Sequence, residues 1–215
     1  MKISFIGGTG NLGYGMALRC AVAGYEVLIG SRESEKAENA AKSLNELVEP
    51  AIPVRGGGNP AVAAEADLVV ISLPYVAHKD TLPLLVEAAK GKVVLDTTVP
   101  MVYGKPPVYS APEAGSAAQG VQNVLEFSKV VSGFHTMSAA SLSEKDRVLD
   151  SDALICGDDQ EAKELVSGIF NAFIPRIFDI GALSQAQSIE RLTPLVIALN
   201  QQYKRKHIGI KLSNV

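Results

Sequence analysis

The sequence predicts an α/β fold of the Rossmann type: a doubly wound, mainly parallel sheet with a small C-terminal helical extension. An apolar run at residues 3–6 passes through glycines directly into a helix-compatible segment. Gly8, Gly10 and Gly13 have the G-x-G-x-x-G spacing of a dinucleotide-binding turn. A second apolar run, at residues 67–74, is continuous rather than alternating, as in a strand buried on both faces of a parallel sheet. Strand-like and helix-like segments then alternate along the chain, which is the pattern of a doubly wound sheet.

The bulk properties fit one globular domain over residues 1–215, with residues 180–215 as the extension. A formal charge of −3 gives no case for binding nucleic acid or a membrane surface. No apolar run is long enough to span a bilayer, and the chain opens in a strand rather than a signal peptide, so we expect a cytoplasmic protein. Cys20 and Cys156 are the only cysteines, so we expect buried thiols and no metal site.

The glycine spacing places a phosphate-binding turn at the start of the first helix. The first glycine makes the turn, the second lets backbone approach a pyrophosphate, and the third packs helix against strand. Unpaired N–H groups and the helix dipole then favour an anion at this helix end. A glycine-rich hairpin would give the same spacing, but the preceding strand and the following helix favour the cofactor interpretation.

The end of the second strand, residues 26–30, favours NADP(H) over NAD(H). NAD enzymes usually carry an acidic residue here for the ribose 2′-hydroxyl. This chain has Ser31 and Arg32, followed by Lys36 one helical turn later. Alternatively, both cations belong to a solvated helix start. Cations near a helix N-terminus are unfavourable without an anion, which favours a 2′-phosphate as their partner.

Periodicity sets the remaining elements. Helices are expected at residues 11–23, 34–48, 76–89, 116–127, 159–170 and 184–203. Further strands are expected at residues 51–54, 67–74, 92–96, 129–133, 152–156 and 176–179. The glycine run at 56–60 is interpreted as a connection before a short helix, rather than a second phosphate loop. Residues 103–113 are expected to form a long loop that can act as a lid.

The strand ends at residues 74 and 96 should line the nicotinamide half of the cofactor, because ligands of open α/β sheets bind at the carboxyl edge. Asp96 could act there as a catalytic acid. No second titratable group lies near it in sequence, so a structural capping role is favoured. Residues 134–140 follow another strand and should reach the same edge.

These stretches resemble the NADP-dependent oxidoreductases that reduce the deazaflavin coenzyme F420. The resemblance covers nearly the whole chain in order. It is carried by residues 7–15, 30–32 with Lys36, 73–74, 129–140, 156–159 and 192–194. It implies a family without a separate substrate domain, in which the C-terminal extension helps to form the deazaflavin cleft, and it implies a homodimer.

The resemblance also assigns site residues. Those expected to hold the pyrophosphate are Thr9, Gly10, Asn11 and Leu12, in the cofactor-binding turn that the glycine spacing already assigned to Gly8, Gly10 and Gly13. Those matching the 2′-phosphate pocket are Ser31, Arg32 and Lys36. Those near the ribose and nicotinamide are Leu73, Pro74, Val99 and Pro100. Those where the deazaflavin stacks are His135, Met137 and Ala139. Ser138 and Tyr75 depart from the family pattern, which has a proline and commonly an indole ring at these positions.

The implied reaction is hydride transfer between C4 of the nicotinamide and C5 of the deazaflavin. Such a transfer needs no nucleophile or metal, and the protein holds the two rings face to face. His135 could donate a hydrogen bond to the polar edge of the deazaflavin. A core histidine that caps the strand end is the alternative for this residue.

Other functions stay open on the sequence. The same scaffold could reduce a free flavin or a ferric chelate, or serve as a non-catalytic NADPH sensor. A β-hydroxyacid dehydrogenase or imine reductase would need a catalytic Lys or Asp and a large helical domain, and only the last thirty-odd residues are available for one. The basic cluster at residues 204–207 could attract the acidic tail of F420, although cation enrichment at a helix C-terminus explains it more simply. The native acceptor and the direction of the reaction are not determined by the sequence.

Overall fold

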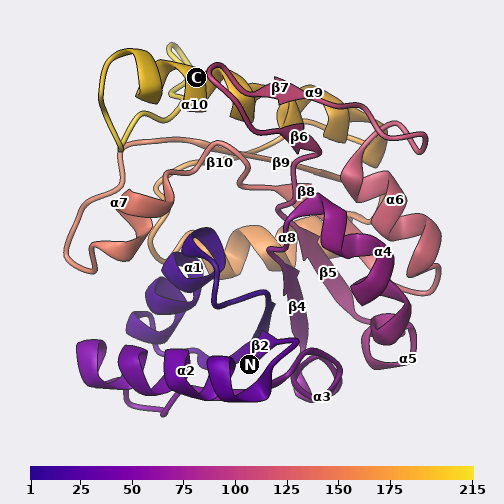
Figure 1. Ribbon diagram of the computed structural model, residues 1–215, viewed down its shortest axis with the longest axis vertical. Helices are drawn as coiled ribbons and strands as arrows, with labels where there is room; N and C mark the ends of the chain where they lie inside the picture. Colours follow the sequence, from indigo (N-terminus) through magenta and orange to yellow (C-terminus); the bar gives the residue numbers. More distant parts are fainter.

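The computed structural model describes all residues, 1–215, and is built around one eight-stranded sheet (Figure 1). The strand order is β3-β2-β1-β4-β5-β8-β9-β10, and every neighbouring pair is parallel except the antiparallel pair β8–β9. The strands are β1 (Lys2–Ile6), β2 (Glu26–Ser31), β3 (Arg55–Gly58), β4 (Leu68–Ile71), β5 (Val93–Asp96), β8 (Lys129–Gly133), β9 (Ala153–Gly157) and β10 (Ile177–Asp179). The predicted Rossmann-type sheet is confirmed.

Helices cover both faces because side chains of the central strands alternate between two buried layers. Ile3 and Phe5 of β1 pack on the side of α1 (Asn11–Val22), α2 (Ser34–Val48) and α8 (Gln160–Phe170). Ile6 packs on the other side, with α3 (Asn59–Glu65), α5 (Val86–Ala89), α6 (Ala117–Val124) and α9 (Ala186–Glu190). The central strands therefore contribute apolar side chains to two cores, which explains their continuous apolar runs in the sequence.

The third strand is displaced from its predicted position. The prediction of a strand at residues 51–54 is wrong, and β3 instead occupies the glycine run that we expected to be a connection. A Cβ atom at Gly56 would lie 2.3 Å from the backbone carbon of Ala37 in α2. Glycine is therefore required for α2 to lie directly on this edge strand, and a run of low strand propensity becomes a strand.

Two predicted helices are divided. The helix expected at 76–89 consists of a 3₁₀ turn (Tyr75–Ala77), α4 (His78–Thr81), a second 3₁₀ turn (Leu82–Leu85) and α5. Pro83 lies near the start of the second 3₁₀ turn, where its missing N–H interrupts α-helical bonding. The helix expected at 184–203 consists of a 3₁₀ turn (Leu183–Gln185), α9 and α10 (Leu192–Gln202), with the break at Arg191. A short helix that was not predicted, α7 (Ala139–Ser143), follows β8.

The segment expected as a lid, residues 103–113, includes β7 (Val108–Tyr109), which forms a small hairpin with β6 (Met101–Val102) just before the segment. Tyr109 Oη donates a hydrogen bond of 2.8 Å to Glu190 Oε2 at the end of α9. Figure 1 shows the hairpin, α9 and α10 together at one end of the molecule, with α2 and α3 at the other. The hairpin and the C-terminal helices thus form one layer over the carboxyl edge of the sheet.

Both cysteines are buried and free, as predicted. None of the helices has the length and apolar character needed to cross a membrane.

Candidate functional site

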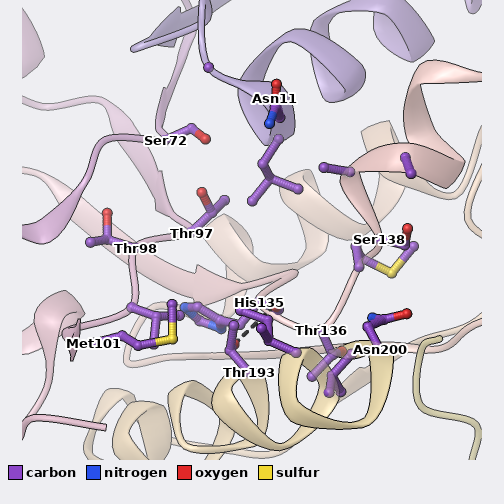
Figure 2. A pocket seen from close by; sticks show the side chains of 18 of the residues that line it. Asn11, Ser72, Thr97, Thr98, Met101, His135, Thr136, Ser138, Thr193 and Asn200 are labelled. Atoms are coloured by element: carbon purple, nitrogen blue, oxygen red, sulfur yellow. Dashed lines mark hydrogen bonds between the residues drawn. The ribbon is translucent and has the colours of Figure 1, made fainter. Parts of the chain in front are cut away.

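A cavity of about 470 Å³ opens at the carboxyl edge of the sheet, between the start of α1 and the C-terminal helix α10 (Figure 2). Six segments contribute to its wall. They are Gly10–Leu12, Ser72–Pro74, Thr97–Tyr103, His135–Ala140, Thr193–Asn200, and the tail residues Lys206 and Ile208. Residues from both ends of the sequence therefore line one open cavity.

The glycine loop holds the first turn of α1 against the strand ends. Gly7 N–H donates to the carbonyl of Gly30 at 3.1 Å, which joins the loop to the end of β2. A Cβ atom at Gly13 would lie 3.1 Å from the carbonyl oxygen of Gly7, so the helix packs closely on the loop. Gly10 is the N-cap of α1 and provides no side-chain cap, while Gly10, Asn11 and Leu12 line the cavity. The uncapped helix end fits the pyrophosphate of a dinucleotide.

The predicted 2′-phosphate residues lie beside the glycine loop but outside the cavity wall. Ser31 is buried at the end of β2, and its Oγ accepts the N–H of Glu33 at 3.2 Å. Arg32 is exposed, and Lys36 Nζ lies 2.7 Å from Glu33 Oε1. A hydroxyl and two cations next to the loop fit a 2′-phosphate. Glu33 was missed by the sequence reasoning, and its carboxylate competes for Lys36.

A network centred on Thr98 shapes the cavity floor between β4 and β5. Thr98 N–H donates to Asp96 Oδ1 at 3.2 Å, and Thr98 Oγ1 lies 2.9 Å from His78 Nε2. Thr97 Oγ1 donates to the carbonyl of Ile71 at 3.0 Å. Burial raises the pKa of Asp96 to about 8, with a further contribution from the charge of Glu190. Asp96 does not line the cavity, and its bond to Thr98 is the capping contact favoured by the sequence.

His135 also lines the cavity, close to the backbone of Thr98, with only 6% of its surface exposed. Neither ring nitrogen has a hydrogen-bond partner in the protein. Burial lowers the pKa of His135 to about 3, against a smaller opposing effect of the Thr98 backbone. The imidazole is therefore neutral at physiological pH, with one N–H donor and one acceptor nitrogen that are both buried without a partner beside the cavity.

Ser138, one of the two departures from the family pattern, fastens the C-terminal tail. Its Oγ donates to the carbonyl of Lys206 at 2.7 Å and accepts the N–H of Ser141 at 3.1 Å, which caps α7. His207 Nδ1 lies 3.0 Å from Ser141 Oγ. Of the basic cluster at 204–207, only Lys206 reaches the cavity wall. Tyr75, the other departure, is 37% exposed and lies outside this wall.

The structure brings together most of the residues assigned to the nicotinamide and deazaflavin. The predicted residues that line the cavity are Gly10, Asn11, Leu12, Leu73, Pro74, Val99, His135, Met137 and Ala139. Those outside its wall are Gly8, Thr9, Gly13, Ser31, Arg32, Lys36 and Pro100. Pro100 is buried and faces a smaller cleft beside the hairpin. Gly8 and Gly13 shape the loop from within, which explains their distance from the cavity.

Several wall residues were not predicted, among them Thr97, Thr98, Thr193, Asn200 and Ile208. The strand-end rule could have found the two threonines of residues 97–98. Nothing local in the sequence marks the residues of α10 and the tail, because their role depends on how the chain returns over the sheet.

A glycine-loop helix end and a large cavity at the carboxyl edge of a Rossmann sheet define a dinucleotide-dependent oxidoreductase. The profile of the family described as "NADP oxidoreductase coenzyme F420-dependent" matches residues 2–100. The F420-dependent NADP reductase of Methanocaldococcus jannaschii is 42% identical over 222 positions, which cover 100% of this chain and 99% of that protein. The enzyme of the same name from Methanothermobacter marburgensis is 38% identical, with 100% and 99% covered.

A crystal structure from Arthrobacter sp. FB24, solved for a candidate F420-dependent NADP reductase, superposes with a TM-score of 0.84. It shares 26% sequence identity, and 100% of each chain is covered. The chain belongs to the F420-dependent NADP reductase family, and the recognition made from its motifs is confirmed.

Proposed function

We propose that the chain transfers a hydride between NADP(H) and coenzyme F420 within the cavity at the carboxyl edge of the sheet. The observation that carries the proposal is that the first turn of α1, the strand-end floor and the His135 segment all face one cavity. Two flat rings can therefore be held in contact by parts of the chain that are themselves fixed by the sheet. The nicotinamide and the deazaflavin supply the hydride chemistry when bound.

The NADP(H) half of the site is assigned to the glycine loop and the end of β2. The N–H groups of the first turn of α1 hold the pyrophosphate, as at other helix N-termini. Arg32 and Lys36 bind the 2′-phosphate, with the hydroxyl of Ser31 beside them. Leu73, Pro74, Val99 and Pro100 are assigned to the ribose and nicotinamide, although Pro100 faces the smaller cleft beside the hairpin.

The deazaflavin half is assigned to the His135–Ala140 segment, α10 and the tail. Met137 and Ala139 provide an apolar surface for the ring, to which the flexible Met137 side chain can adapt. The neutral His135 imidazole donates a hydrogen bond to the polar edge of the deazaflavin. Because its pKa is lowered by burial to about 3, His135 stabilises charge by hydrogen bonding rather than by carrying a proton. Residues 180–215 act as the extension that completes this half of the site.

The partner and location follow the family. We propose that the chain acts as a homodimer in the cytoplasm and that a small-molecule redox co-substrate is its only reaction partner besides NADP(H). Light scattering of the purified protein tests the dimer, and a mass of one chain, 22.7 kDa, contradicts it.

The function is tested by NADPH oxidation with F420 as acceptor, beside matched assays with FMN, FAD and ferric chelate. The proposal expects rapid loss of the absorbance of oxidised F420 and slow reaction with the other acceptors. Faster reduction of a flavin or ferric chelate would favour the alternative acceptors of this scaffold. Tight NADPH binding without turnover of any acceptor would favour the sensor.

A further inference from the structure

Asn200, on α10, has an amide group with a defined orientation at the cavity wall. Its Oδ1 accepts the N–H of Ile208 at 3.3 Å. A backbone N–H can only donate, so the oxygen must face the tail and Nδ2 must turn the other way. No group of the protein accepts a hydrogen bond from Nδ2. Asn200 also lines the cavity, on the side opposite Asn11 (Figure 2).

The tail that orients Asn200 is itself held in place. Asp152 N–H donates to the carbonyl of Ile210 at 2.8 Å, and Asp152 Oδ2 accepts the N–H of Leu212 at 2.6 Å. Asp152 is buried and is paired with Arg176, whose Nη2 lies 2.6 Å from the Asp152 carboxylate. The orientation of the amide is therefore set before any ligand binds.

The neighbouring hydroxyls are already used within the protein. Thr193 Oγ1 donates to the carbonyl of His135 at 3.0 Å, and Ser138 Oγ donates to the carbonyl of Lys206 at 2.7 Å. Val196 and Ile197 make the adjoining wall apolar. A donor at an apolar wall favours a flat ligand that presents a carbonyl oxygen at its edge.

We propose that Asn200 is a specificity-determining residue for the second substrate, donating from Nδ2 to a carbonyl oxygen of the pyrimidinedione ring of the deazaflavin. This inference rests on the proposed function, because it takes the second substrate to be a deazaflavin. The nicotinamide carboxamide also carries a carbonyl. Asn200 is assigned to the deazaflavin because it lies across the cavity from the α1 end that fits the cofactor phosphates.

The test compares two variants of Asn200 with one control. Asn200→Asp is nearly isosteric and still accepts the Ile208 N–H, but it replaces the donor by a carboxylate oxygen. Asn200→Ala removes the donor without adding charge. Gln202→Glu makes the same amide-to-carboxylate change at an exposed position of the same helix that has no side-chain contact to the cavity. Binding of oxidised F420 is measured by quenching of its fluorescence, and binding of NADPH by its own emission.

Both Asn200 variants should raise the dissociation constant of F420 by about tenfold or more, as expected when a hydrogen-bond donor to a buried acceptor is lost. NADPH affinity should change by less than about twofold, and Gln202→Glu should behave as wild type. If the wild-type protein reduces F420 normally, two results would overturn the role of Asn200 and leave the proposed function intact. They are wild-type F420 affinity in both variants, or equal losses of F420 and NADPH affinity. Failure of the wild-type protein to bind or reduce F420 would overturn the proposed function and this inference together.

Discussion

Substitution of Arg19 should most directly break the contact between the NADP(H) half and the deazaflavin half of the site. It lies in the last turn of α1, only 7% exposed, and its guanidinium donates to four backbone carbonyls. The acceptors are Leu142 at 2.9 Å, Ser141 at 3.0 Å, Glu144 at 2.5 Å and Arg147 at 2.8 Å. One side chain thus joins the phosphate-binding helix to α7 and the loop after it.

The perturbation is Arg19→Met, which keeps the apolar stem and removes the donors. The carbonyls of Leu142 and Ser141 are in buried bonds, whereas the other two are partly exposed and can be hydrated. A buried acceptor left without a donor costs about 1–3 kcal/mol, so the two together predict a loss of about 2–6 kcal/mol in the free energy of unfolding. Helices α1 and α7 pack closely at Gly15, because a Cβ atom there would lie 2.8 Å from Leu142 Cβ.

Urea unfolding measures the global loss, and hydrogen exchange of the amides in residues 139–147 measures the local one. Exchange should accelerate there more than in the central strands. Lys42→Met is the control, since Lys42 is an exposed cation of α2 without an ion pair. An Arg19→Met protein with a wild-type urea midpoint and unchanged protection of residues 139–147 would show that the Arg19 hydrogen bonds do not hold α7 against α1.

Three further predictions concern charge. Arg32→Ala should weaken NADPH binding much more than NADH binding. Glu33→Gln frees Lys36 from an ion pair of 2.7 Å and should tighten NADPH binding by up to a few-fold. Titration with both cofactors measures these changes, and equal effects on NADPH and NADH would contradict the 2′-phosphate assignment. His135→Ala should slow turnover with little change in NADPH affinity, and unchanged turnover would make His135 a structural residue. Because burial lowers the pKa of His135 to about 3, the wild-type kcat should show no histidine inflection between about pH 5 and 8. Burial raises the pKa of Asp96 from 3.8 to about 8 in the folded protein. Between these two pH values the folded protein keeps the Asp96 proton and the unfolded chain loses it, so the free energy of unfolding falls as the pH rises from 3.8 to about 8. Asp96→Asn should flatten the fall in melting temperature, and an unaltered slope would exclude a protonated Asp96.

Local sequence signals predicted the elements that depend on short-range physics. The helix at Ser34–Val48 and the strand at Lys129–Gly133 have the predicted bounds, because helical periodicity and a buried apolar run are visible within each segment. The glycine loop was found because its spacing is tied to one backbone geometry. The residues nearest the cofactor phosphates could therefore be proposed without a structure.

The elements that were missed depend on contacts between distant segments. A strand in the run Arg55–Gly58 is favoured only because α2 lies directly on Gly56. Arg19 finds its carbonyl partners more than 120 residues away, at Ser141 and beyond. Asn200 becomes a candidate donor only through Ile208, in a tail that returns over the sheet. No pattern within one segment encodes these contacts, so tertiary structure was needed to find them.

Direct hydride transfer between two rings that share the cavity is tested by isotope labelling. NADPH carrying deuterium at the transferred position of C4 is oxidised by the protein with F420 in ordinary water, and the reduced deazaflavin is examined by NMR. Direct transfer should place the deuterium at C5 of the deazaflavin. Deuterium lost to water, or NADPH oxidised without labelled product, would contradict transfer within this cavity.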